Sequence, residues 1–312
     1  MTMFYEKNNE KNNEKTLDLT ELVDFLDQQV DFNDIESIKE SAPFVQRISN
    51  DTNWYIELLN KEIELNVLSD KEFKNQYTSN STLLGRSKVG KPYFLRTNIW
   101  LPESNSLRSG MSKSFFAEDF YHDHSFDLLT VGLLGSGYTT NIRNYDHKST
   151  IGYKEEVVET SETEQYRLES GTALFMEKHK TIHQQIAPKD TSVSFNIMLD
   201  NIKYPKSRQY EFETLTSNKM KIRSIHHNGY RFSASIEYLI TMACNFYDDN
   251  TKDYLIELYN KLIVNPSDHE PTIILLRSWF KKVGITNKDI FKFDFAKNQH
   301  LRYHFEQIET EV

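Results

Sequence analysis

The residues of this chain whose type and spacing could do chemistry are three histidines. His122 and His124 are separated by one residue, and His183 follows later in the chain, after the apolar stretch Ala173–Met176. Side chains two apart on a β-strand point to the same face, so His122 and His124 can enter one interior together. Imidazoles bind divalent transition metals, and a third histidine would complete a set that leaves positions open for substrate. The pattern predicts a metal site with these three ligands.

Short strands must position these histidines, because the residues around them alternate between apolar runs and turn residues. A strand is expected between Pro92 and Pro102, where aromatic and β-branched residues cluster. Further strands are predicted at 128–134, 139–145, 155–158, 166–168, 173–176 and 192–199. Many short strands separated by Gly, Asn and Asp are typical of an all-β barrel or jelly roll.

Helical patterns precede and follow the strands. Asp18 or Thr20, Asp34 and Asp51 each stand before an apolar run and are suitable helix N-caps. The helical period returns from about Phe232. We therefore predict an α+β fold with three regions, which are an N-terminal tail and helical region at 1–88, a β-barrel at 89–210 and a C-terminal helical region at 211–312.

Composition limits the functional classes. The chain has 312 residues with a net charge of −9, from 37 basic and 46 acidic residues, so it lacks the basic character of a nucleic-acid-binding domain. Its one cysteine, Cys244, lies in an apolar helical stripe and is expected to be a core residue. The N-terminus shows no apolar stretch of a signal peptide, and no segment is apolar enough to span a membrane. A cytoplasmic protein with no membrane or nucleic-acid partner is expected.

The histidines also carry a family resemblance. His122-Asp123-His124, the following Gly135-Ser136-Gly137 and the block from Gly171 to His183 resemble the two motifs of the cupin superfamily. The resemblance implies a double-stranded β-helix, the cupin jelly-roll barrel, that binds a divalent metal through the three histidines. Cupins usually add a Glu four residues after the second histidine. Leu128 occupies that position and Asp127 precedes it, so a carboxylate ligand remains an open question.

A three-histidine site without the carboxylate is similar to the thiol dioxygenase branch of the cupins, which uses Fe(II) and O₂. Ser194 matches the Ser of that branch's Ser-x-His-x-Tyr strand, but Asn196 and Met198 replace its His and Tyr. Thiol dioxygenation itself is therefore not favoured. The resemblance implies Fe(II) as the metal, with Zn, Ni, Mn or Cu as alternatives.

Three further residues are candidate catalytic or substrate-binding groups. Arg96 could bind a substrate carboxylate through its guanidinium fork, or be a surface residue at a strand end. His179 precedes His183 by four residues in a predicted loop and could face the substrate or support a ligand, or be an exposed histidine. Asn196 could offer its amide to the substrate, or satisfy a polar position in the core.

The leading hypothesis is a metal-dependent oxygenase, a dioxygenase or hydroxylase, that acts with O₂ on a small, amino-acid-like substrate. The flanking helices would then close the barrel mouth or form a homodimer interface. Two alternatives remain. Cupin barrels also resemble the sensory half of arabinose-type transcription activators, and residues 278–286 are similar to their second helix-turn-helix. The barrel could instead be a metal-free interaction module.

Overall fold

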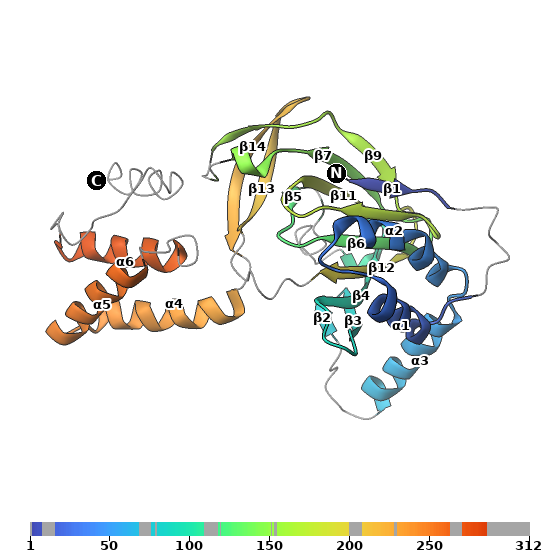
Figure 1. The fold of residues 1–312 in the computed structure, drawn as a ribbon, viewed down its shortest axis with the longest axis horizontal. Coiled ribbons are helices and arrows are strands. Elements are labelled where there is room, and N and C mark those ends of the chain that lie inside the picture. Colours follow the sequence, from blue (N-terminus) through green and yellow to red (C-terminus); the bar gives the residue numbers. More distant parts are fainter. Residues whose placement is uncertain are drawn as a thin grey trace.

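The structure is a computed structural model that describes residues 2–7, 16–68, 76–78, 80–108, 118, 120–150, 152, 155–199, 208–227, 230–262 and 270–285. Two antiparallel sheets form the centre of this part of the chain, and helices flank them (Figure 1). The residues 8–15 of the polar N-terminal tail lie outside the described residues.

Sheet A has seven strands within the described residues, in the order β1-β10-β6-β12-β4-β3-β2. In that order the strands are Met3–Tyr5, Ala173–Met176, Leu128–Leu134, Ser192–Leu199, Tyr93–Trp100, Ser81–Arg86 and Gln76–Thr78. Alternate residues of its central strands point to opposite faces, and both faces are buried. On β4, Tyr93 and Leu95 belong to one apolar cluster, whereas Phe94 belongs to another.

Sheet B also has seven strands in the described part of the chain, in the order β8-β14-β13-β5-β11-β7-β9. In that order they are Val157–Glu159, Lys219–His227, Arg208–Thr216, Tyr121–Asp123, Thr181–Ile186, Thr139–Asn144 and Glu164–Arg167. Short 3₁₀ helices lie at Ser106–Arg108 (η3) and His147–Ser149 (η5).

The two sheets enclose a common interior. Phe94, Leu128 and Met198 of sheet A join Ile142 of sheet B in one cluster of buried side chains. This is the packing of a jelly-roll barrel, in which the inner faces of two antiparallel sheets form the core. The predicted α+β fold, with a jelly-roll barrel flanked by N-terminal and C-terminal helices, is confirmed.

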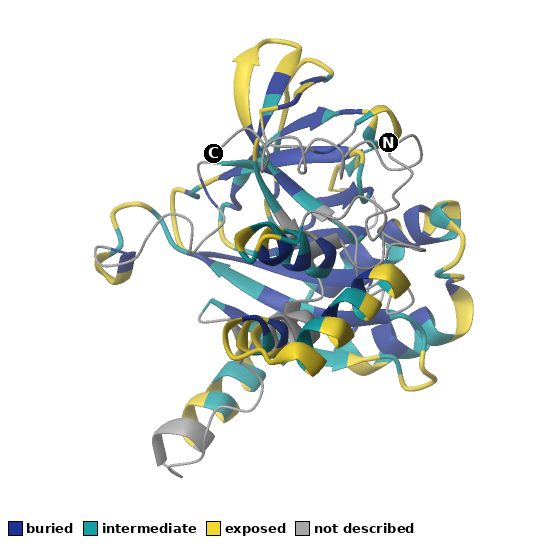
Figure 2. Ribbon diagram, turned by 90° about the vertical axis from the view of Figure 1, so that its left-hand side faces the viewer, coloured by how far each residue is buried: buried dark blue, intermediate teal, exposed yellow. Residues whose placement is uncertain are grey.

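The N-terminal helices cover the outer face of sheet A, away from the barrel interior. They are α1 (Leu19–Gln29), α2 (Ile35–Val45), η2 (Gln46–Ser49) and α3 (Asn53–Leu68). Their buried side chains share one cluster with outward-facing residues of β4, β6, β10 and β12. Figure 2 shows the contrast between the buried strands and helix surfaces that carry exposed residues. Burial of each large apolar side chain in this layer contributes roughly 1.5–3 kcal/mol.

The helix starts follow the predicted caps. The Asp18 carboxylate accepts a hydrogen bond from the Glu21 N–H at 2.8 Å, and the Glu21 side chain bonds back to the N–H of Asp18. Asp34 accepts from the Glu36 N–H at 3.1 Å. These bonds satisfy amides that have no partner in the first helical turn.

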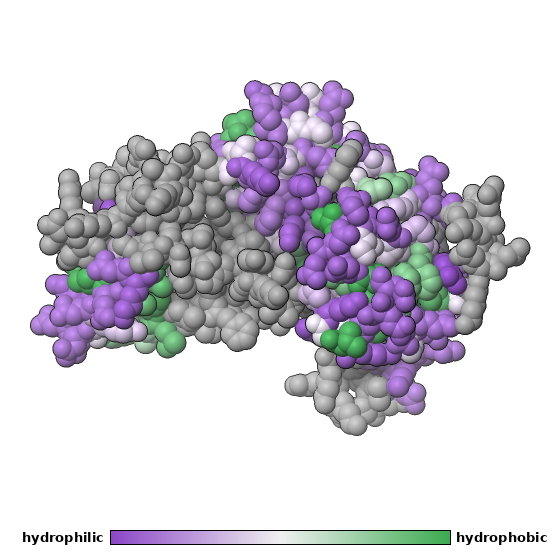
Figure 3. Space-filling model, viewed as in Figure 1, coloured by the Kyte–Doolittle hydropathy of each residue, from purple (hydrophilic) through white to green (hydrophobic). Residues whose placement is uncertain are grey.

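The C-terminal helices form a second apolar core. They are α4 (Tyr230–Asn245), α5 (Asp249–Leu262) and α6 (Glu270–Lys282), and Figure 1 shows them beside the barrel. The buried members of this core are Ile240, Cys244, Leu255, Tyr259, Ile273, Leu276, Trp279 and Phe280. Cys244 is thus a core residue, as the sequence predicted, and burial raises the pKa of its thiol. Figure 3 shows that much of the described surface in this view is hydrophilic, with small apolar patches. None of the described helices is long and apolar enough to cross a membrane.

The sheets extend past the range 89–210 that the sequence indicated for the barrel. Strands β2 and β3 come before it, and β13 and β14 continue beyond it. In β14 the polar residues Lys219 and Lys221 alternate with Met220 and Ile222, which are buried. This alternation is a strand pattern that the prediction of a helical region from 211 onward overlooked.

Gly137 shows why the turn after β6 needs glycine. Its backbone has φ +74°, and a Cβ added there would lie 2.0 Å from the carbonyl oxygen of Leu168. The turn therefore requires both a left-handed conformation and the close approach of a second backbone segment.

We expect Gly137→Ala to destabilise the protein by about 1–3 kcal/mol, because an alanine would be strained in this backbone conformation and would clash with Leu168. Urea unfolding followed by circular dichroism would measure the loss. Gly85→Ala is the control, since a Cβ at Gly85 would meet nothing within 4 Å. Equal stabilities for the two variants would contradict the explanation.

Candidate metal centre

Strand β5 brings the first two histidines to the barrel interior. His122 lies on β5 and His124 follows its last residue, so the two rings share a face while Asp123 points the other way. Asp123 is fully buried, and its carboxylate accepts hydrogen bonds from the Tyr145 hydroxyl at 2.6 Å and the Tyr210 N–H at 2.6 Å. These hydrogen bonds of the Asp123 carboxylate fix the orientation of β5. With Asp123 held on the outer face, His122 and His124 point to the interior.

Strand β11 supplies the third histidine. His183 is paired with His122 in the β5–β11 ladder and with Ile142 in the β7–β11 ladder. Residues directly opposite in a ladder place their side chains on the same face. The Ile142 side chain belongs to the interior cluster, so His122 and His183 share that interior.

The three imidazoles form one compact group. Among the residues that the structure describes, the ligand atoms of His122, His124 and His183 lie within 4.8 Å of one another. The Nε2 atoms of His124 and His183 are 3.1 Å apart. Two nitrogens each about 2.1 Å from one metal, at right angles around it, are separated by about 3 Å. The donor set and its spacing thus fit a single transition-metal ion.

The electrostatic setting favours neutral rings. Burial lowers the pKa of His124 well below its usual value, and the nearby His122 and Arg96 lower it further. Burial likewise lowers the pKa of His183 well below its usual value, with additional lowering from His122 and His124. Only a neutral imidazole has a lone pair to give a metal. The site therefore presents His124 and His183 as neutral imidazoles, which is the charge state that a metal ion requires.

Arg96 faces the same interior. It lies on β4 opposite Asn196 of β12, and the preceding residue, Leu95, packs outward against the helices, so Arg96 points to the interior. Its charge lowers the pKa of His124 and also that of Tyr138, so the guanidinium lies within electrostatic reach of both. The structure thus places this predicted substrate-binding residue beside the histidine group.

Asn196 and Thr130 continue this polar wall on the neighbouring strands β12 and β6. The two residues are paired in the ladder, and both are buried. The Asn196 amide lies 3.4 Å from the Ser194 hydroxyl and 3.5 Å from the Arg96 carbonyl oxygen. At these long distances the amide is held only weakly, so it can turn toward a bound molecule.

Comparisons with known proteins find similar solved structures but no similar sequences. No family profile and no curated protein sequence matches the chain. Salicylate 1,2-dioxygenase from Pseudoaminobacter salicylatoxidans aligns over 53% of this chain and 37% of its own, with 12% identity and a TM-score of 0.27. Hydroxypropylphosphonic acid epoxidase from S. wedmorenis aligns over 38% and 51%, with 16% identity and a TM-score of 0.23.

Vicilin from Corylus avellana, the hazelnut, aligns over 44% of this chain and 32% of its own, with 10% identity and a TM-score of 0.26. The matched segments thus span 32% to 51% of these proteins' own lengths.

His179 lies apart from the three-histidine group. It sits in the turn before β11 with φ +56°, and its Nδ1 is 3.7 Å from the carboxylate of Asp123. Its ring centroid is 4.3 Å from that of His147. Its backbone N–H donates to the His124 carbonyl oxygen at 2.9 Å. The structure therefore connects His179 to the site through the backbone of His124, with its ring on the outer side of β5.

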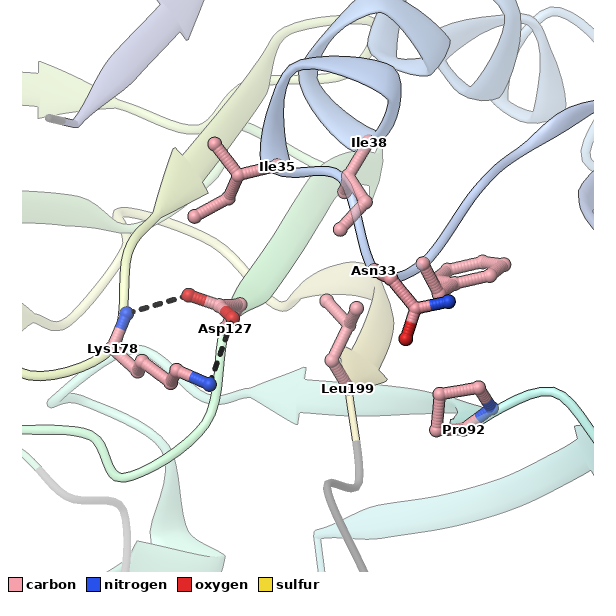
Figure 4. A pocket seen from close by; sticks show the side chains of 8 residues that line it. Asn33, Ile35, Ile38, Pro92, Asp127, Lys178 and Leu199 are labelled. Carbon is pink, nitrogen blue, oxygen red and sulfur yellow. Dashed lines mark hydrogen bonds and ion pairs between the residues drawn. The ribbon is translucent and has the colours of Figure 1, made fainter. Parts of the chain in front are cut away.

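Asp127, the carboxylate nearest to the usual cupin position, also points elsewhere. Its side chain accepts a hydrogen bond from the Lys178 N–H at 2.8 Å and lies 3.9 Å from the Lys178 ammonium. Burial raises the pKa of Asp127. It lines a pocket of about 220 Å³ together with Ile35, Ile38 and Leu199. Figure 4 shows these side chains beside the start of α2. This carboxylate anchors the turn between β10 and β11.

Two polar residues near the histidines, Gln185 and Glu211, were not identified from the sequence. Gln185, two residues after His183 on β11, lies 3.0 Å from its Nδ1. The strand period would have placed it on the same face. Glu211 of β13 is paired with His122 in the ladder and accepts a hydrogen bond from the Ser224 hydroxyl at 2.7 Å. It lies just past the predicted end of the barrel, so no pattern linked it to the histidines.

We expect the metal-free protein to lose stability as the pH falls below 6.5. In the unfolded chain His124 and His183 bind protons near pH 6.5, whereas in the folded protein their lowered pKa values keep them neutral. The unfolded state then binds more protons, and each histidine costs about 1.4 kcal/mol of stability per pH unit.

Urea unfolding of chelator-treated protein between pH 7.5 and pH 5 would measure this dependence. A His124→Gln/His183→Gln variant should show a shallower fall, by up to about 2.7 kcal/mol per pH unit. Identical slopes in the two proteins would show that these imidazoles are protonated in the fold.

Proposed function

We propose that this protein is a metal-dependent cupin oxygenase that oxidises a small carboxylate, such as an amino acid, with O₂. The observation that carries the proposal is the group of three buried histidines inside the barrel, with two Nε2 atoms 3.1 Å apart. His122, His124 and His183 would hold the metal. We favour Fe(II), which supplies the O₂-dependent redox chemistry of such a site.

The interior wall supplies the groups that would bind the substrate. Arg96 carries a permanent positive charge, and a guanidinium can donate two parallel hydrogen bonds to a carboxylate. Burial raises the pKa of Tyr138 to about 12, although the Thr130 hydroxyl and Arg96 act in the opposite direction. Tyr138 therefore stays a neutral phenol that can donate a hydrogen bond. Asn196 offers an amide from the adjoining strand.

The barrel would also limit access of water to the reaction. Phe94, Leu128 and Met198 line the interior around the polar groups. An enclosed apolar surround strengthens electrostatic interactions and protects reactive species from hydrolysis. The N-terminal helices contribute indirectly, because they pack on the outside of sheet A and hold β4 and β12 in place.

Protein purified without oxygen should contain one equivalent of iron by elemental mass spectrometry. The His124→Ala/His183→Ala variant should lose the metal, while circular dichroism shows that the fold is kept. His147→Ala is a matched control, because His147 stacks against Tyr210 outside the metal-binding group. One equivalent of zinc or nickel would redirect the search to non-oxidative chemistry. Absence of metal from the wild type would contradict the proposal and favour a metal-free interaction module.

Oxygen uptake with a panel of amino acids and small carboxylates would identify the substrate. On that substrate, Arg96→Gln should raise KM by about 10–100-fold, because a hydrogen bond to a charged group contributes about 1.5–3 kcal/mol. The iron content should stay unchanged, since Arg96 is not a ligand. Arg86→Gln, at an exposed arginine of β3, is the control. An unchanged KM in Arg96→Gln would exclude the carboxylate contact.

A further inference from the structure

Gln185 is a buried polar side chain in direct contact with a proposed metal ligand, His183. Its exposed fraction is 5%, that of His183 is 1%, and its amide nitrogen is placed 3.0 Å from His183 Nδ1. The two residues are two apart on β11, so the strand itself directs both side chains to one face. The other ring nitrogen of His183, Nε2, points at His124.

The orientation of the Gln185 amide leaves one atom unsatisfied. Its Oε1 is buried without a hydrogen-bond partner. The oxygen and nitrogen of a side-chain amide have almost the same shape, and their assignment follows from the hydrogen bonds they make. Turning the amide over places Oε1 against His183 Nδ1. That oxygen then accepts a hydrogen bond from an Nδ1–H, and the amide nitrogen takes the position that Oε1 held.

The amide orientation decides which ring nitrogen of His183 can bind a metal. A neutral imidazole carries one proton, and the unprotonated nitrogen has the lone pair. If Gln185 accepts a proton at Nδ1, the lone pair lies at Nε2, toward His124. The 3.1 Å contact between the Nε2 atoms is then satisfied in the metal-free protein by an N–H of His124.

We propose that Gln185 is the positioning residue of the metal site, whose amide oxygen accepts the Nδ1 proton of His183 and so directs the Nε2 lone pair to the metal. This inference deepens the proposed function and rests on it for the identity of the site. Outer partners of this kind fix the tautomer and ring orientation of histidine ligands. His122 has a corresponding backbone partner, with Nδ1 at 3.5 Å from the Phe120 carbonyl oxygen.

The surroundings hold Gln185 in place. Its backbone pairs with Thr140 of β7 on one side and forms a parallel bridge with Glu118 on the other. The Glu118 carboxylate forms a buried ion pair with Arg108, whose guanidinium also donates to the Leu101 carbonyl oxygen. A satisfied buried ion pair is costly to disturb. The segment beside Gln185 is therefore firmly anchored, which limits the ways in which its amide can move.

The neighbouring residue offers a matched control. Gln184 lies on the opposite face of β11, where its Oε1 accepts a hydrogen bond from the Asn141 amide at 3.1 Å. It has the same side chain on the same strand, but that side chain points away from His183. Gln184→Leu therefore reports the effect of removing a glutamine from β11 without touching the metal site.

The test uses Zn(II), which is diamagnetic and accepts imidazole ligands. Competition titration against a chromophoric chelator should show that Gln185→Leu weakens Zn(II) binding by about 10–100-fold. Gln185→Glu keeps an oxygen acceptor at the same place and should restore the affinity. Gln184→Leu should bind as the wild type does. Equal affinities in Gln185→Leu and the wild type would overturn the proposal.

A second measurement separates this inference from the function itself. Two-bond ¹H–¹⁵N correlation spectra of the metal-free protein, assigned by a His183→Gln variant, show which ring nitrogen carries the proton. We expect protonation at Nδ1 in the wild type, and loss of that preference in Gln185→Leu. A proton at Nε2 in the wild type would refute the role of Gln185. Failure of the wild type to bind any metal would remove the proposed function, while the spectrum still decides the tautomer.

Discussion

The buried carboxylate of Asp123 is the constraint on which the site depends. It sits between His122 and His124 and points away from both, and it accepts hydrogen bonds from the Tyr145 hydroxyl and from the backbone N–H of Tyr210. A fully buried charge must keep its partners, because leaving it unpaired costs several kcal/mol. A slip of β5 by one residue would put Asp123 inside and the histidines outside. The carboxylate thus fixes the register that creates the histidine group.

Side chains of β4 also alternate between the outer and the inner face of the barrel wall. Tyr93 and Leu95 pack against the N-terminal helices, and Arg96 faces the interior beside the histidines. One strand therefore joins the helical layer to the proposed substrate-binding wall. Hydrogen bonds add to this connection, since the Tyr93 hydroxyl donates to Asp27 of α1 at 2.8 Å. The N-terminal helices thus support the site from the outer face of sheet A. The expectation that the flanking helices close the barrel mouth or form a dimer interface stays a prediction.

Much of the architecture was predictable because its signals are local. Apolar runs bounded by turn residues gave strands β6, β10 and β12 their observed limits, and the spacing of the histidines predicted that they would meet. What escaped prediction depends on contacts between distant segments. His179 turns outward because its backbone adopts φ +56° and its ring meets Asp123. Glu211 reaches His122 only through the pairing of β13 with β5, which no local pattern reveals.

The long-range pairing of strand β1 has a consequence for how the protein folds. Met3–Tyr5 forms β1, which pairs with β10 at one edge of sheet A, with Met3 opposite Phe175. During synthesis β1 is made before its partner strand, which lies more than half the chain further on. Pairings of such long range slow folding. Until β1 docks, β10 presents an open strand edge, which is a template for association with other chains. Strand β1 therefore covers this edge of sheet A, and it can do so only after β10 has been made.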